Sequence, residues 1–363
     1  MLFAEFMGMV NRCHGRQLAL KWVDAGEDSI LGLIDPGVKV RGAIVALQSC
    51  THQHKSSRMD AGLARRLIEV EGGLMPELPE VETMRRGILQ VQGARITDVQ
   101  RLRGTHKPIT VLPKPAVFRR RAKGQTIVEV GRVGKRVVLS LSSSDVIVLE
   151  PRMTGLVLLA DPPNVEHLRL QIDLDQCSVQ HLWFWDRRGL GSVQLLTPDE
   201  FRQRLGPDRL GPDALQLDPE LLRDRLGSSR REIKVALLDQ RALAGVGNLY
   251  ASEILHVAGV HPEKRCDRIS RPQWQRIHQA MEGVLLEAIE HEGSTLSDGT
   301  YRNALNQSGG YQHLHRVYDR DGELCPSCES ALVQRIVQCQ RSTFFCPHCQ
   351  TKGVRRTAVR KPR

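Results

Sequence analysis

Cys325-Pro326-Ser327-Cys328 and Cys346-Pro347-His348-Cys349 are the strongest structural signal in this chain. Each pair supplies two sulfurs from one tight turn, and 17 residues separate the pairs. Four thiolates at this spacing are typical of a closed, tetrahedral zinc site with a structural role. The segment Leu332 to Phe345 has the length of a β-hairpin, so we expect a zinc finger in which a hairpin lies between the two pairs. His348 and Cys339 are close by, but four cysteines already complete the ligand shell.

The alternative for these cysteines is a pair of disulfides in a secreted protein. It requires an oxidising compartment, and no segment resembles a cleavable signal peptide. Five of the nine cysteines lie between positions 325 and 349, and the others are scattered, as expected in a reducing cytoplasm. No apolar run reaches about 18 residues, so we expect a cytoplasmic protein without a membrane span.

Met75-Pro76-Glu77-Leu78-Pro79-Glu80-Val81-Glu82-Thr83 resembles the beginning of a protein, although 74 residues precede it. If Met75 were the initiator and were removed, Pro76 would present a secondary amine, a nucleophile that forms iminium adducts with aldehydes and sugar C1′ carbons. An α-amino group has a pKa of about 8, below that of lysine, so more of it is unprotonated at neutral pH. The alternative is structural, because prolines and acidic residues also favour a helix start.

Residues 1–74 contain no motif that connects them to the rest of the chain. Their His52-Gln53-His54 segment lacks further ligands at a suitable spacing, so we expect a solvated loop there. The segment ends in Glu71-Gly72-Gly73-Leu74, and codons for Glu-Gly-Gly can contain a ribosome-binding sequence. We therefore expect translation to start at Met75, with a genuine extension as the alternative.

Hydrophobic periodicity predicts a strand-rich region followed by a helical one. A helix is expected at 80–92, and the boundary between the two regions at 196–212, which is rich in Gly, Pro and charge. The expected strands, separated by turn residues as in a β-sandwich, are 95–102, 126–130, 136–141, 146–149, 156–159, 168–174 and 179–185. The later expected helices are 219–226, 233–238, 248–258 and 271–291.

The overall charge favours a polyanionic partner. The chain has 52 basic and 41 acidic side chains, a net charge of +11. A basic surface that is merely solvated is the alternative. The tail from Thr351 to Arg363 is rich in Lys and Arg and is expected to be disordered, serving either phosphate attraction or solubility.

Three motifs in one order resemble the bacterial formamidopyrimidine-DNA glycosylase family, over residues 75 to about 350. They are Pro76 to Thr83, the loop and helix Ala244-Gly245-Val246-Gly247-Asn248-Leu249-Tyr250-Ala251-Ser252-Glu253, and Gln340 to Cys346 in the zinc finger. The resemblance implies an α+β multidomain protein. Its expected parts are a catalytic β-sandwich at 75–196 with flanking helices, a helix–two-turn–helix domain at 197–295, a lesion loop and zinc finger at 296–350, and a basic tail at 351–363.

The resemblance also implies a bifunctional repair enzyme that removes oxidised purines from double-stranded DNA. Pro76 nitrogen would attack C1′ and form a Schiff base, and β- and δ-elimination would then cut the strand at the abasic site. Glu77, beside the nucleophile, is suited to protonate the sugar ring oxygen and shuttle protons. Lys135 matches a lysine that helps orient the sugar, and Glu80 is assigned only to positioning the N-terminus.

Further positions match residues that hold DNA. Asn248, Lys234 and Arg341 correspond to phosphate contacts, and free N–H groups of the Gly245–Asn248 loop are expected to help. Other residues would fill the space left by the extruded base. They are Met153, for which core packing is the alternative, Arg188, and Leu190, which stands where Phe is usual.

Two departures from the family pattern affect local contacts. Glu150-Pro151-Arg152 replaces His-Leu-Gly before Met153, and the gap between the cysteine pairs is one residue longer than usual. The sequence of the loop from Ser294 to Tyr311 does not indicate specificity for 8-oxoguanine and formamidopyrimidines over oxidised pyrimidines.

We expect a nucleoid-associated monomer with one structural zinc ion. Two alternatives remain. One is an endonuclease VIII-like glycosylase for oxidised pyrimidines, whose usual Pro-Glu-Gly-Pro opening differs from Pro76-Glu77-Leu78-Pro79. The other is a catalytically silent protein that binds damaged DNA.

Overall fold

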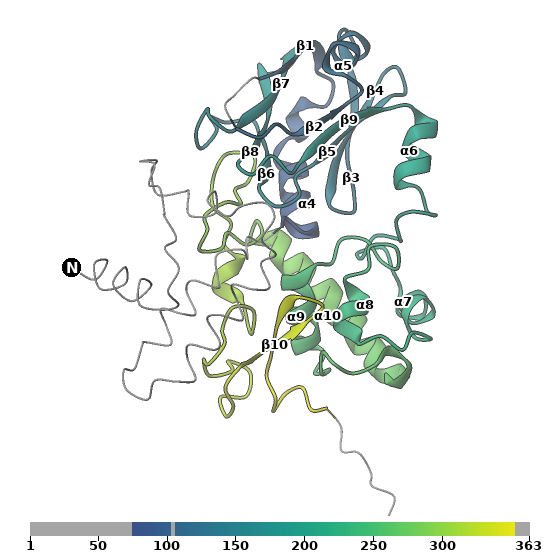
Figure 1. The fold of residues 1–363 in the computed structure, drawn as a ribbon, viewed down its shortest axis with the longest axis vertical. Coiled ribbons are helices and arrows are strands. Elements are labelled where there is room, and N and C mark those ends of the chain that lie inside the picture. Colours follow the sequence, from purple (N-terminus) through teal and green to yellow (C-terminus); the bar gives the residue numbers. More distant parts are fainter. Residues whose placement is uncertain (1–74, 103–105, 353–363) are drawn as a thin grey trace, which may run out of the picture. The chain divides into compact units, whose positions relative to one another are not determined.

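The computed structural model describes residues 75–102 and 106–352. The predictions for residues 1–74 and for the tail beyond Lys352 lie outside these residues. The described chain has a strand-rich lobe and a helical lobe, each with its own hydrophobic core, and helix α4 (Leu78–Gly87) packs against both (Figure 1). The expected α+β architecture is therefore confirmed.

Two sheets form the strand-rich lobe, with orders β1-β7-β8-β6 and β2-β9-β5-β4-β3. Neighbouring strands are antiparallel except for β2 and β9, which are parallel. The β-sandwich and its seven predicted strands are confirmed, whereas β2 and β9 are absent from the prediction. The strands are β1 (Arg95–Arg101), β2 (Thr110–Leu112), β3 (Ile127–Val133), β4 (Arg136–Leu141), β5 (Val146–Glu150), β6 (Gly155–Leu158), β7 (Leu168–Asp175), β8 (His181–Asp186) and β9 (Ser192–Leu196).

Side chains from both sheets meet in one core. Leu139 and Ile147 come from the second sheet and Leu156 and Phe184 from the first, and all four are buried. Burial of each such side chain contributes roughly 1.5–3 kcal/mol. Because Met84 of α4 belongs to the same core, the packing of the sheets also fixes the residues just before α4.

Helix α4 begins earlier than predicted, at Leu78 rather than at residue 80, and ends at Gly87. Pro79 suits the first turn, where its missing N–H is not needed. Glu80 Oε2 accepts the backbone N–H of Glu77 at 2.9 Å and so satisfies a group at the helix start. The remainder of the predicted helix is a short 3₁₀ turn, Leu89–Val91.

Arg132 at the end of β3 connects α4 to the segment that leads into the helical lobe. Its Nε lies 3.1 Å from Glu82 Oε2, and its Nη2 lies 3.1 Å from Asp213 Oδ1. All three side chains are largely shielded from solvent, with 10–13% exposed. The network therefore helps to fix the lobes around α4.

The helical lobe is built around α9 and α10, which pack together. Leu249, Ile254 and Trp274 are buried in its core. The four later helices of the prediction are confirmed, while α5 and α6 are absent from it. The helices are α5 (Pro115–Ala122, in the strand-rich lobe), α6 (Pro198–Leu205), α7 (Pro219–Leu226), α8 (Ile233–Leu237), α9 (Asn248–Val257) and α10 (Arg271–Glu290).

The predicted hairpin near the C-terminus is confirmed as β10 (Gln334–Gln338) and β11 (Arg341–Phe345). Cys339 and Gln340 form its two-residue turn with φ values of 47° and 62°, the sign that such a turn requires. Strand β11 packs against α9 (Figure 1). Among the described residues, no helix has the length and apolar character needed to cross a membrane.

Candidate active site and nucleic-acid interface

Glu77 lies where the start of α4 meets the start of α9. Pro76 and Glu77 are both buried, and Leu78 N–H donates to Gly245 O at 3.0 Å. Glu77 Oε1 accepts the backbone N–H of Leu249 at 3.0 Å, while its Oε2 is buried without a hydrogen-bond partner. The loop Gly245–Asn248 was expected to leave its N–H groups free for a phosphate. That expectation is wrong for Gly245, whose N–H donates to Gln240 Oε1 at 3.0 Å, and the N–H of Leu249, the residue after the loop, is also occupied, by Glu77.

Lys135, from the β3–β4 turn, extends to the position of Glu77 at the start of α9. A Cβ added to Gly247 would lie 2.3 Å from Glu77 Cδ and 2.6 Å from Lys135 Nζ, so both side chains converge on this glycine. Burial raises the pKa of Glu77 to about 7, although the positive charge of Lys135 opposes this rise. Burial lowers the pKa of Lys135, and the charges of Glu77 and Glu80 oppose that change. The site thus holds an acid that is partly protonated at neutral pH.

Glu80 connects three segments that are distant in sequence. Besides the N–H of Glu77, its carboxylate accepts the hydroxyl of Tyr250 at 2.6 Å and the N–H of Ser294 at 2.9 Å. The side chain is fully buried, and this burial raises its pKa. Glu80 therefore ties the residues before α4 to α9 and to the segment that follows α10.

Lys234, Asn248 and the hairpin meet at the start of α9. Lys234 Nζ donates to Asn248 Oδ1 at 2.6 Å, to Thr343 Oγ1 at 2.6 Å and to Ser342 O at 3.0 Å. Asn248 Nδ2 also donates to Ser342 O, at 3.1 Å. Burial lowers the pKa of Lys234 to about 7, although the negative charge of Glu77 opposes this change. Arg341 is exposed at the first position of β11.

Met153, Arg188 and Leu190 lie in two turns that are tied together. Met153, which is half-buried, is in the β5–β6 turn, and the other two follow β8. The residues that connect these turns, Thr154 and Asp186, are absent from the predicted site. Thr154 Oγ1 donates to Asp186 Oδ1 at 2.5 Å and accepts the N–H of Arg188 at 2.9 Å. Asp186 Oδ2 also accepts the N–H of Gly191 at 2.7 Å. An acid directly before Arg187-Arg188-Gly189 is the signal that could have identified Asp186.

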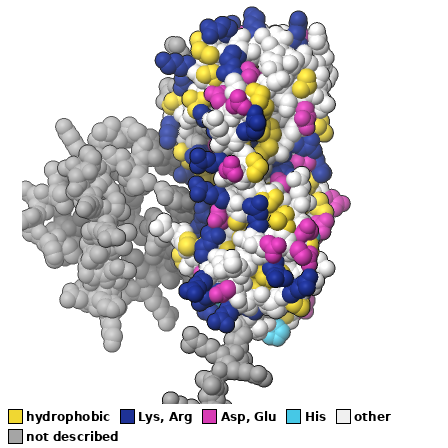
Figure 2. All heavy atoms as spheres, turned by 90° about the vertical axis from the view of Figure 1, so that its right-hand side faces the viewer, with side chains coloured by type: hydrophobic (Ala, Val, Ile, Leu, Met, Phe, Trp, Pro, Cys, Tyr) yellow, Lys and Arg dark blue, Asp and Glu magenta, His cyan; other side chains and the backbone are white. Residues whose placement is uncertain are grey.

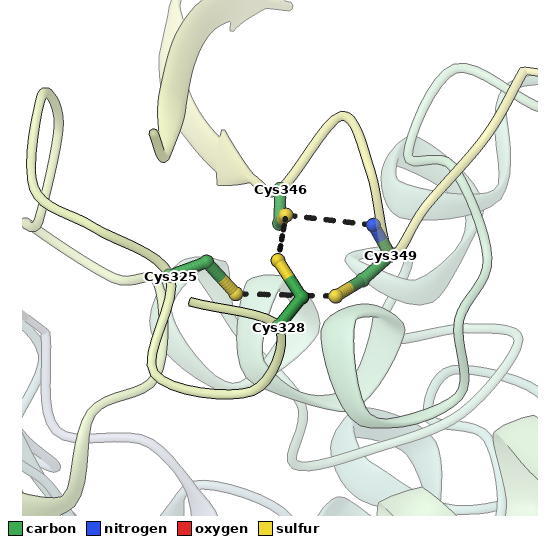
Figure 3. Close-up of side chains that lie close together, drawn as sticks. All are labelled: Cys325, Cys328, Cys346 and Cys349. Atoms are coloured by element: carbon green, nitrogen blue, oxygen red, sulfur yellow. Dashed lines mark hydrogen bonds between the residues drawn. The ribbon is translucent and has the colours of Figure 1, made fainter. Parts of the chain in front are cut away.

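The four predicted cysteines come together as free thiols, so the disulfide alternative is wrong (Figure 3). Their sulfur atoms all lie within 4.8 Å of one another, with Cys325 and Cys349 at 3.9 Å and Cys328 and Cys346 at 3.7 Å. A tetrahedral ion with metal–sulfur bonds of about 2.3 Å would separate its ligands by about 3.8 Å. The group is therefore suited to hold a metal ion, and neither His348 nor Cys339 belongs to it.

A second group of possible ligands, His106, Glu166 and His167, also lies within 4.8 Å. Arg169 Nη2 is 3.3 Å from His167 Nδ1, and positive charges on Arg169 and Arg187 act on this ring. These charges oppose a cation at this position.

Charge alone does not identify the binding surface. On the face drawn in Figure 2, Lys and Arg side chains are spread widely and alternate with Asp and Glu. The interface must therefore be located from the side chains that the fold brings together.

Comparison with known proteins gives matches over about three quarters of the chain. A model of the formamidopyrimidine-DNA glycosylase N-terminal domain matches residues 75–193, and one of the H2TH domain of that glycosylase matches residues 205–300. The formamidopyrimidine-DNA glycosylase of Chloroflexus aurantiacus is 40% identical over 283 residues, which are 76% of this chain and 98% of the relative. That of Thermomicrobium roseum is 38% identical over 294 residues, 76% of this chain and 99% of the relative.

Solved structures give the same result. The MutM (Fpg) protein of Thermus thermophilus is 36% identical, with a TM-score of 0.66, and the match covers 77% of this chain and all of that one. The Lactococcus lactis Fpg in complex with DNA containing an abasic site is 31% identical, with a TM-score of 0.68, and covers 76% of this chain and all of that one.

Proposed function

Because this chain belongs to the formamidopyrimidine-DNA glycosylase family, we propose that it excises oxidised purines from duplex DNA and then cleaves the resulting abasic site. The observation that carries the chemical part is Glu77, a buried acid directly after Pro76, with one unpartnered oxygen and a pKa raised to about 7. A mutant of the Lactococcus lactis Fpg has been solved with DNA that contains Fapy-dG, and that Fpg has been solved with DNA that contains an abasic site, which supports this substrate class.

The proposed nucleophile is the secondary amine of Pro76 in a protein that begins there. The family match that starts at residue 75 supports this start. The amine attacks C1′ of the extruded nucleotide, a nitrogen–carbon bond forms, and the bond from C1′ to the base breaks. The base leaves with the bonding electron pair and takes up a proton, and the nitrogen loses its own proton. Glu77 donates a proton to the sugar ring oxygen as the ring opens, leaving an iminium ion.

Strand cleavage follows from the same group of residues. Loss of a C2′ proton expels the 3′ phosphate, and a second elimination expels the 5′ phosphate. We assign these proton transfers to Glu77 as carboxylate, since a carboxyl with a pKa of about 7 exchanges protons readily at neutral pH. Lys135, which meets Glu77 at Gly247, is proposed to orient the sugar.

For DNA binding, we propose that Asn248 and Arg341 hold phosphates and that Met153, Arg188 and Leu190 fill the space of the extruded base. Lys234 is assigned a positioning role, because its three hydrogen bonds all go to protein acceptors that fix Asn248 and the hairpin. A zinc ion on the four cysteines would stabilise the hairpin that presents Arg341. The proposed active form is a monomer that acts on chromosomal DNA in the cytoplasm.

Borohydride trapping tests this function and separates it from the alternatives. A protein that begins at Pro76 should be trapped on duplex DNA containing 8-oxoguanine more efficiently than on duplex DNA containing an oxidised pyrimidine. The reverse preference would favour an endonuclease VIII-like enzyme. Binding to both duplexes without any trapped adduct would identify a silent binding protein.

A further inference from the structure

Glu150, the last residue of the central strand β5 of the second sheet, pairs with two arginines. Val137 of β4 pairs with Leu149 of β5, which places Arg136 beside Glu150. Arg136 Nη2 donates to Glu150 Oε1 at 2.6 Å, and Ser192 Oγ donates to Oε2 at 3.2 Å. Arg152 Nε lies 3.6 Å from the same Oε2. Two guanidinium groups therefore share one carboxylate, and the group keeps a net positive charge.

Arg152 is the looser and more exposed of the two partners. Its side chain is 55% exposed, against 23% for Arg136. A distance of 3.6 Å is an ion pair rather than a hydrogen bond, so the donors of this guanidinium are available to a second anion. A planar guanidinium binds phosphate through two parallel hydrogen bonds.

The backbone of Arg152 adopts a conformation that arginine disfavours. Its φ is +53°, in the left-handed region that glycine adopts without penalty. The family pattern His-Leu-Gly, which Glu150-Pro151-Arg152 replaces in this chain, has glycine at the position of Arg152. A bulky residue kept in such a conformation points to a use for its side chain.

The position of Arg152 indicates what that use is. It directly precedes Met153, one of the residues proposed to fill the space of the extruded base. Arg136 directly follows Lys135, which meets Glu77 at Gly247. The two arginines around Glu150 are therefore sequence neighbours of Lys135, a proposed chemical residue, and of Met153, a proposed space-filling residue.

We propose that Arg152, oriented by Glu150, binds a phosphate of the DNA backbone next to the extruded nucleotide. This inference rests on the proposed function for the identity of the ligand. The contact attaches the turn that contains Met153 to the DNA backbone through a charged side chain.

The test compares substitutions of Arg152 with one matched control. Arg152→Asn removes the charge, and asparagine tolerates the left-handed conformation, whereas Arg152→Lys retains the charge. Arg152→Gly provides a second uncharged variant if the asparagine variant folds poorly. The control is Arg95→Gln at the start of β1, because Arg95 is 48% exposed and also pairs with a carboxylate, Asp175.

The measurement is the dissociation constant for a duplex with a stable abasic-site analogue over a range of salt concentrations. Arg152→Asn should weaken binding about threefold to tenfold and reduce the slope of log affinity against log salt by about 1. Arg152→Lys should restore most of the slope, and Arg95→Gln should match the parent. Thermal unfolding should show that Arg152→Gly is at least as stable as the parent.

The outcomes separate this inference from the proposed function. If the parent is trapped by borohydride but Arg152→Asn shows the parent's affinity and slope, the phosphate contact is wrong and the function stands. If the slope falls but the parent is never trapped, the contact stands and the glycosylase chemistry is wrong. A parent that does not bind this duplex would overturn both.

Discussion

Glu77 Oε1 accepts the backbone N–H of Leu249 at 3.0 Å, so the first turn of α9 holds the carboxyl that precedes α4. These residues are far apart in the chain and belong to different lobes. The proposed proton donor is thus positioned by the element that also carries Asn248, a proposed phosphate ligand. The start of α9 therefore positions both Glu77, the proposed proton donor, and Asn248, the proposed phosphate ligand.

The raised pKa of Glu77 predicts a pH-dependent effect of Glu77→Gln on stability. The pKa of Glu77 is raised from its ordinary value of 4.5 to about 7 in the folded protein, so between these two pH values the unfolded chain loses this proton while the folded chain keeps it. The free energy of unfolding of the parent therefore falls as pH rises through this range. The difference corresponds to roughly 3 kcal/mol at most. Thermal unfolding should show that the stability of Glu77→Gln relative to the parent increases between about pH 5 and pH 8. Near pH 4 the two proteins should have similar stability. Base excision should be lost at every pH. An unchanged stability difference across this range would contradict a raised pKa.

Gly247→Ala should damage the site without unfolding the protein. Its Cβ would lie 2.3 Å from Glu77 Cδ and 2.6 Å from Lys135 Nζ, so both groups must move. A displacement of about 1 Å at reacting groups lowers rates by about 100-fold. The matched control is Gly283→Ala in α10, where nothing lies within 4 Å of the added atom. Single-turnover excision should be lost in the first variant and retained in the second, and equal rates would remove Gly247 from the site.

Lys234→Met should weaken DNA binding and the fold together. The buried acceptor Thr343 Oγ1 and the partly buried acceptors Asn248 Oδ1 and Ser342 O would lose their shared donor, which costs about 2–4 kcal/mol of unfolding free energy. Lys352→Met is the control, since Lys352 is 66% exposed and pairs only at the surface with Glu263. Denaturant unfolding and lesion-DNA affinity measure both effects. Weakened binding at unchanged stability would instead support a direct phosphate contact.

Cys325→Ser should abolish metal binding and weaken lesion-DNA binding while the strand-rich lobe stays folded. Zinc-site folding energy is local to such small modules. Cys339→Ser is the matched control, because Cys339 is exposed at the hairpin turn and lies outside the group of four. Metal content and DNA affinity are measured for both. A variant that lost its metal yet bound DNA like the parent would show that the finger has no role in binding.

Helices and strands are predicted well from the sequence where apolar residues recur at regular spacing. They are predicted poorly where charged residues obscure this spacing. Helix α7 is predicted to the residue, whereas α5 and α6 are rich in arginine, and α6 buries none of its residues. The short parallel strand β2 has no periodic pattern of its own, because its pairing with β9 is a long-range contact.

Residue types and local motifs indicate the candidate site residues, whereas the contacts that connect these residues are not indicated by the sequence. Pro76, Glu77 and the four cysteines stand in local motifs that the sequence displays. The meeting of Glu77, Lys135 and Gly247 depends on how the two lobes pack, and no local pattern encodes it. The same holds for Asp186, whose hydrogen bonds to Thr154 and to the following turn appear only in the folded chain.

The most direct test of the account is to find which atom carries the trapped DNA. A protein produced from Met75 is first shown by mass spectrometry to begin at Pro76, and is then reduced with borohydride on duplex DNA containing 8-oxoguanine. Peptide mapping should place the adduct on the peptide that starts with Pro76, and a protein verified to begin at Met1 should give none, since its Pro76 nitrogen is an amide. An adduct on Lys135, or strand cleavage by the protein that begins at Met1, would contradict Pro76 as the nucleophile.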